Sequence, residues 1–86
     1  MRLLTFARRD RPKRLGAGAM LGQRIVDLAA AQALRGKRGA KVPNSVRGIL
    51  EAGPAGLEAV KELIAFAKTR KGATAVLKRA DVVIAP

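Results

Sequence analysis

The first third of the chain alternates between apolar and other residues with the period of two that β-strands show. Arg2–Phe6 forms one such run, and Leu15–Leu21 forms a second in which Leu and Ala alternate with Gly and Met. Gly22-Gln23 separates the second run from Arg24–Leu28, and glycine adopts the positive φ of a tight turn at no steric cost. The pattern predicts an N-terminal strand followed by a hairpin.

After the hairpin the apolar spacing becomes that of helices. Asp27 is suited to cap the first helix, because its carboxylate can accept the free N–H groups of the first turn. Pro54 suits the first turn of the last helix, where its missing N–H is not needed. The predicted helices are Leu28–Leu34, ended by Gly36; a short helix from Asn44 or Ser45 to Gly53; and a third that runs to about Lys68.

Two short strand candidates follow, Ala75–Leu77 and Val82–Ile84, with Lys78-Arg79 between them. We predict an α+β fold over residues 1–86. Its small antiparallel sheet combines the N-terminal strand, the hairpin and a short C-terminal strand, and about three short helices cover it. The residues predicted to form its core are Leu4, Phe6, Leu15, Leu21, Ile25, Val26, Leu28, Leu50, Leu57, Val60, Ile64 and Phe66.

The composition narrows the chemistry that the chain can perform. Its 86 residues make one domain of modest stability, and they include no His, Cys, Tyr or Trp. There is thus no disulfide framework and no thiolate metal site, which fits a reducing compartment, and we expect a cytoplasmic protein. The apolar run at the N-terminus is too short for a signal peptide, and no run approaches the length of a membrane span.

The charge is strongly positive and unevenly distributed. The formal net charge is +12, and residues 1–47 carry 12 of the 18 Lys and Arg residues but two of the six acidic ones. Such an imbalance suggests an anion-binding surface, although solvated loops are the simpler interpretation. A third cluster, Lys68, Arg70 and Lys71, follows the last helix. The candidate anion-binding residues lie in two earlier clusters, both expected in loops: Arg8, Arg9, Arg11, Lys13 and Arg14, and then Arg35, Lys37, Arg38 and Lys41.

The other candidate motifs are weak. The Gly16, Gly18 and Gly22 spacing is one residue too long for a dinucleotide-binding loop, and we interpret these glycines as hairpin residues that allow close packing or a bulge. Glu58 and Glu62 share a helix face, but no further ligands accompany them for a hard cation that prefers about six. We therefore predict no catalytic, cofactor-binding or metal-binding residue in this chain.

Several segments, in order, resemble the N-terminal domain of the fumarylacetoacetate hydrolase family. They are the Met-Arg-Leu-Leu-Thr-Phe start, Leu-Gly-Ala at 15–17, Gly-Gln-Arg-Ile-Val-Asp-Leu-Ala-Ala-Ala at 22–31, Ser-Val-Arg-Gly-Ile-Leu-Glu-Ala-Gly-Pro-Ala-Gly-Leu-Glu-Ala-Val at 45–60, and Ala-Asp-Val-Val-Ile-Ala-Pro at 80–86. The basic stretches at 8–14 and 35–41 depart from the family pattern.

The resemblance implies a non-catalytic domain. In the family, a later β-roll domain holds Mg²⁺ or Mn²⁺ with carboxylates, and a His assists hydrolysis, isomerisation or decarboxylation of acylpyruvate-type 2-oxo acids. Residues 78–86 resemble the segment that leads into that domain, so none of its catalytic positions has a counterpart here. The expected partner is a catalytic domain or subunit of the same family. A truncated piece of such a protein, with no independent role, is one alternative, and a small basic protein that binds RNA or another polyanion is another.

Overall fold

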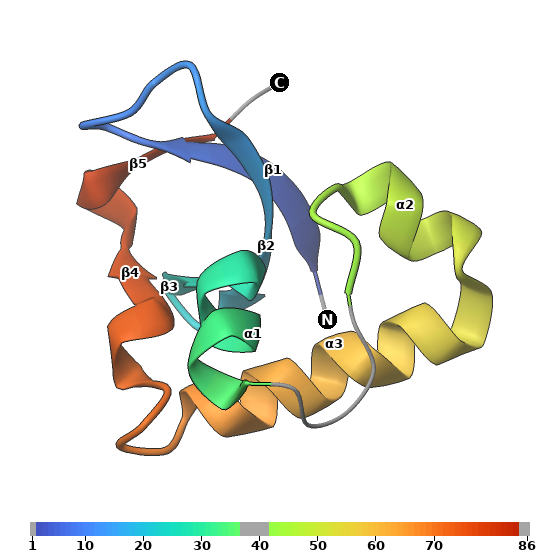
Figure 1. Cartoon of the computed structure of the whole chain (residues 1–86). Helices are drawn as coiled ribbons and strands as arrows, with labels where there is room; N and C mark the ends of the chain where they lie inside the picture. Colours follow the sequence, from blue (N-terminus) through green and yellow to red (C-terminus); the bar gives the residue numbers. More distant parts are fainter. Residues whose placement is uncertain (1, 37–41, 85–86) are drawn as a thin grey trace.

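The fold is that of a curled antiparallel sheet packed against three helices (Figure 1). The computed structural model describes residues 2–36 and 42–84. The elements in these ranges are β1 (Leu3–Arg8), β2 (Leu15–Leu21), β3 (Arg24–Asp27), α1 (Leu28–Arg35), α2 (Val46–Glu51), α3 (Gly53–Ala67), the 3-10 turn η1 (Ala73–Ala75), β4 (Val76–Lys78), the 3-10 turn η2 (Arg79–Asp81) and β5 (Val82–Ile84).

The predicted α+β class and antiparallel sheet are confirmed. The strand order is β4-β3-β2-β1-β5, with every pair antiparallel. Gly22 has φ +62° between β2 and β3, and glycine at the first central position is typical of a two-residue hairpin turn. Both C-terminal strand candidates join the sheet, at opposite edges. The predicted order, which counted one strand after the helices, was therefore one strand short.

The connection between β4 and β5 forces the sheet to curl. Five strands spaced about 4.8 Å apart would place the edges of a flat sheet about 19 Å apart. Yet only η2, a three-residue turn, separates these edge strands, and such a turn advances about 6 Å. Because β4 and β5 run in the same direction, residues 76–84 form one strap that leaves the β3 edge and joins the β1 edge. The result is a half-barrel closed on one side by this strap.

The curl divides the apolar residues between two cores. Side chains from both edges meet on the inner face, where Phe6, Ile25 and Val82 are buried and Leu4, Met20, Leu77 and Ile84 pack against them. The helices cover the outer face, and the core there is rich in alanine. Its buried members are Ala17, Ala19, Val26, Leu28, Ala31, Ile49, Val60, Leu63, Ala67 and Ala75.

Two residues predicted in the core are exposed. Leu50 is 59% exposed because α2 turns Ile49 inward instead, and Leu15 is 60% exposed because it begins β2 on the outer face beyond the helices. The other predicted core residues are buried or pack against the two cores. The prediction also omitted Leu63 and Val82, which are buried.

The predicted boundaries hold within two residues, the predicted Asp27 cap forms, and of Asn44 and Ser45 it is Ser45 that caps α2. The Asp27 carboxylate accepts from Ala30 N at 3.1 Å, and Ser45 Oγ accepts from Gly48 N at 3.0 Å. Arg8 belongs to β1, and Arg35 ends α1, so these two cations do not lie in loops as predicted. None of the helices in the described ranges has the length and apolar character that crossing a bilayer requires.

We expect Gly18→Ala to destabilise the domain, because a Cβ there would lie 2.9 Å from Phe6 Cδ1 and 3.0 Å from Ile25 Cγ2. Overpacking of this kind costs about 1–3 kcal/mol. Gly16→Ala is the matched control. Its Cβ would lie 3.2 Å from the Asn44 side chain, which can shift, so this variant should lose less stability. Urea unfolding of both variants measures the difference, and an equal or larger loss for Gly16→Ala would contradict this packing.

Candidate functional site

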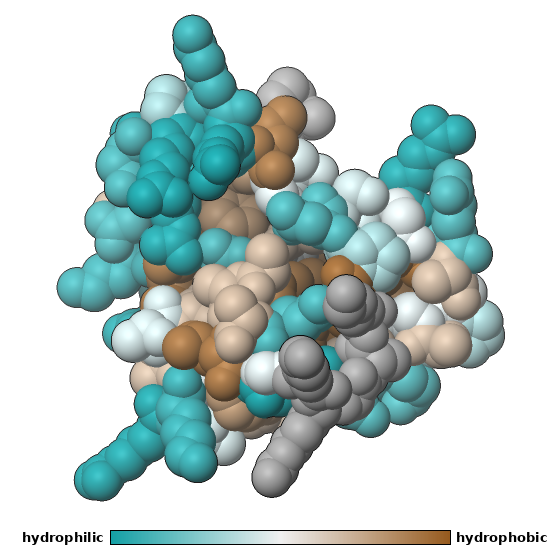
Figure 2. Space-filling view, viewed as in Figure 1, coloured by the Kyte–Doolittle hydropathy of each residue, from teal (hydrophilic) through white to brown (hydrophobic). Residues whose placement is uncertain are grey.

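A hollow of about 470 Å³ opens at one mouth of the half-barrel, and we call it the arginine hollow. It lies where the β1–β2 connection, the start of α1 and the segment before α2 meet. Hydrophilic side chains dominate this part of the surface in Figure 2, at the upper left. Its lining residues are Phe6, Arg8, Asp10, Arg11, Arg14, Leu15, Gly16, Asp27, Ala29 and Asn44.

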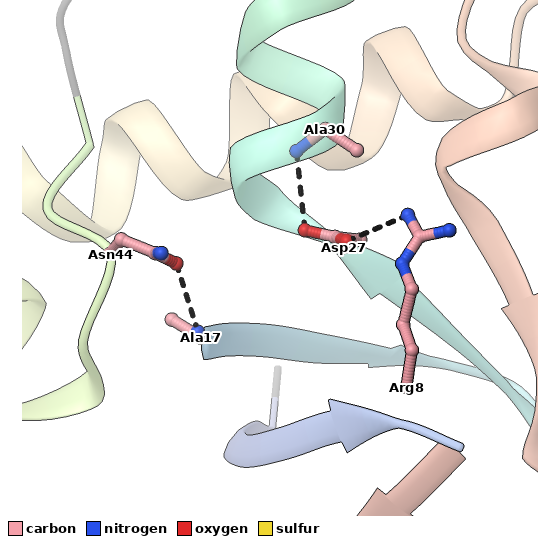
Figure 3. Close-up of polar contacts among 5 residues, drawn as sticks. All are labelled: Arg8, Ala17, Asp27, Ala30 and Asn44. Atoms are coloured by element: carbon pink, nitrogen blue, oxygen red, sulfur yellow. Dashed lines mark hydrogen bonds and ion pairs between the residues drawn. The ribbon is translucent and has the colours of Figure 1, made fainter. Parts of the chain in front are cut away.

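Arg8 and Asp27 form the central polar contact of the arginine hollow (Figure 3). Arg8 Nη2 donates to Asp27 Oδ2 at 2.9 Å, while Asp27 Oδ1 accepts from Ala30 N. One carboxylate thus caps α1 and orients the guanidinium group. The Asp27 side chain is 15% exposed and that of Arg8 is 40% exposed. Arg8 is therefore held at one side and remains open to solvent at the other.

Two glycines of β2 lie on the inner face beside this contact. The register places Gly18 directly beside Asp27, and Gly16 lies two residues away on the same face. Phe6 and Ile25 pack above Gly18, and the Asn44 side chain lies above Gly16. Asn44 borders the same region, and its Oδ1 accepts from Ala17 N at 3.2 Å at a point where β3 no longer pairs with β2 (Figure 3).

The backbone of the β1–β2 connection gathers three arginines. Arg11 N donates to Arg8 O at 2.9 Å, and Arg14 N donates to Arg11 O at 3.1 Å. These bonds close two consecutive turns that begin and end at Arg8, Arg11 and Arg14. All three arginines line the arginine hollow. Their spacing of three was the sequence signal that could have distinguished them within the basic run.

The connection is also fixed to the strap. Arg9 N donates to Asp81 O at 3.1 Å, and the Arg9 guanidinium group donates to Ala80 O. Arg9 therefore holds the loop, and it does not line the arginine hollow. Lys13 lies in the same connection but outside that lining.

The predicted basic clusters do not form one surface in the described part of the chain. Arg35 ends α1, its side chain is 11% exposed, and its Nη1 lies 3.6 Å from Glu62 Oε2 on α3. The cluster after α3 lies at the opposite end of the molecule from the β1–β2 connection (Figure 1). Lys37, Arg38 and Lys41 lie outside the described residues.

The carboxylates considered as metal ligands face cations. Glu58 Oε1 lies 3.5 Å from Lys61 Nζ, and Glu62 lies beside Arg35. Within residues 2–36 and 42–84, no three His, Cys, Asp or Glu residues lie close enough together to hold a metal ion. The chemistry that this geometry offers is hydrogen bonding by guanidinium groups, which recognise carboxylates and phosphates with paired N–H donors.

We expect the Arg8–Asp27 contact to stabilise the domain. In a double-mutant cycle with Arg8→Gln and Asp27→Asn, the coupling should be about 1 kcal/mol, since solvent screens part of the charge attraction. Asp27→Ala should lose about 1 kcal/mol more than Asp27→Asn, because Asn still caps a helix and Ala does not. Thermal and urea unfolding measure both effects. A coupling near zero would show that the ion pair contributes nothing.

No family model matches this chain, and it has no match among the curated proteins or the solved structures compared with it.

Proposed function

We propose that this chain is a non-catalytic, N-terminal-type domain of a fumarylacetoacetate-hydrolase-like protein, and that it packs against a metal-dependent catalytic domain or subunit of that family. The order of resembling segments along the chain suggests this relation. A single structural observation supports a docking role, namely an apolar strip at one end of the outer face of the sheet, in which Leu15 and Val83 are exposed and Ala7 between them is buried.

The strip crosses three adjacent strands. Ala7 on β1 pairs with Leu15 on β2 and with Val83 on β5, so the three side chains share the outer face. Leu15 is 60% exposed and Val83 is 47% exposed. Leu15 and Val83 thus flank a buried alanine on one face, and grouped exposed apolar residues are more typical of contact surfaces than single ones, which are common everywhere.

The position of the strip is consistent with a catalytic partner. The resemblance places the catalytic domain directly after the segment 80–86, and this segment contains β5. A domain attached there would lie beside Val83 and could cover the strip. Under this proposal the metal chemistry belongs to the partner, as the resemblance implies.

We expect the purified 86-residue chain to show no turnover of acylpyruvate substrates above the buffer rate in the presence of Mg²⁺ or Mn²⁺. Loss of the substrate's enol absorbance follows the reaction, and a known member of the family serves as the positive control. Metal-dependent turnover by this chain would overturn the non-catalytic assignment.

We expect the chain to bind a catalytic subunit of the fumarylacetoacetate hydrolase family through the strip. The partner is first captured from cells that produce this protein, then identified and purified for the binding measurement. Isothermal titration should show binding by the native chain and at least about tenfold weaker binding by Leu15→Glu or Val83→Glu, because a buried carboxylate without a partner is costly.

Leu50→Glu is the matched control, since Leu50 is exposed on α2 away from the strip. Its affinity should stay within about twofold of native, as expected outside the contact. A captured partner from another family would contradict the proposed relation. Equal affinity of the native chain and both strip variants would contradict the docking surface.

A further inference from the structure

The arginine hollow carries more positive than negative charge. Three guanidinium groups line it, from Arg8, Arg11 and Arg14, together with the carboxylates of Asp10 and Asp27. Asp27 is already engaged by Arg8 and by the first turn of α1. Among the described residues, the side chains of Arg11 and Arg14 have no hydrogen-bond or ion-pair partner. Two complete guanidinium groups therefore remain available to a ligand.

The backbone around the hollow and one of its guanidinium groups are fixed before an anion binds. Arg8 is oriented by Asp27, and the two i to i+3 backbone bonds fix the turns that carry Arg11 and Arg14. The bonds from Arg9 to the strap fix the whole connection against the sheet. A site whose groups are held before binding loses less conformational entropy when the ligand arrives, which raises affinity.

The ligand that fits is small. A volume of about 470 Å³ lies in the range of small-molecule pockets. A long polyanion needs a continuous track of cations, but among the described residues Arg35 faces Glu62, and the cluster after α3 lies at the far end of the molecule. Single-stranded nucleic acid is commonly bound by aromatic side chains on which its bases stack. The chain has two aromatic residues, of which Phe6 is buried and Phe66 packs against the outer core.

We propose that the arginine hollow binds a small oxyanion, a carboxylate or a phosphate, through the guanidinium groups of Arg8, Arg11 and Arg14. The planar forks of Arg11 and Arg14 donate paired N–H groups to the anion's oxygens. Arg8 donates from the nitrogens that Asp27 does not engage. This inference does not depend on the proposed relation to the hydrolase family.

The test is a titration of the ¹⁵N-labelled chain, followed by amide NMR, with inorganic phosphate in one arm and malonate in the other. Sodium chloride at equal ionic strength is the reference. We expect saturable shifts confined to residues in and beside the lining of the arginine hollow, among them Arg11, Arg14, Gly16 and Ala29. The arm with the lower dissociation constant identifies phosphate or carboxylate as the preferred group.

Variants distinguish binding at a specific site from attraction by the net positive charge of the chain. Arg11→Gln and Arg14→Gln should each raise the dissociation constant about tenfold, since each removes a charge-assisted pair of donors. Lys13→Gln removes a charge from the same connection but not from the lining, and Arg70→Gln removes one from the far end. The dissociation constants of both control variants should stay within about twofold of the native value, because solvent screens these charges. All four side chains are exposed, so these variants should fold normally.

Three outcomes would overturn the proposal. Shifts that grow linearly with either anion would show that no site exists. A loss with Lys13→Gln as large as that with Arg11→Gln would show that net charge alone attracts the anion. Tight binding of single-stranded RNA that weakens steeply with salt, together with no saturation by phosphate or malonate, would show that the surface binds a polymer.

Discussion

The architecture depends on one geometric constraint, the three-residue connection between strands at opposite edges of the sheet. A flat five-stranded sheet cannot satisfy it, because its edges would lie too far apart for η2 to join. The sheet must therefore curl, and residues 76–84 become a strap shared by both edges. This curl turns one face of the sheet into an enclosed core and leaves the other for the helices.

The candidate site is a consequence of the same curl. The strap provides the carbonyls of Ala80 and Asp81 to which Arg9 binds, and this contact fixes the β1–β2 connection at the mouth of the half-barrel. Beside this connection, Arg8 on β1 bonds to Asp27 at the end of β3. The strap that closes the half-barrel therefore also positions the connection that carries the arginines of the hollow. A change that loosened the strap would also disperse the arginines.

The two surfaces proposed for function adjoin each other. Leu15 belongs to the apolar strip and also lines the arginine hollow. A partner that covered the strip would lie next to the arginines, and an anion held there would be near the boundary between the two proteins. Exposed apolar residues and a hollow lined by arginines thus lie at the same end of the sheet.

The sequence by itself determined the local elements, because their signals act over a few residues. Alternation marked the strands, Asp27 and Ser45 marked helix starts, and Gly22 marked the hairpin turn. What only the tertiary structure decided depends on contacts between distant residues. The opposite-edge positions of β4 and β5, the burial of Val82 and the gathering of three arginines with Asp27 and Asn44 all follow from the curl. Short-range periodicity does not predict the curl, because the curl arises from the distance that a short connection must span between the two edges of the assembled sheet.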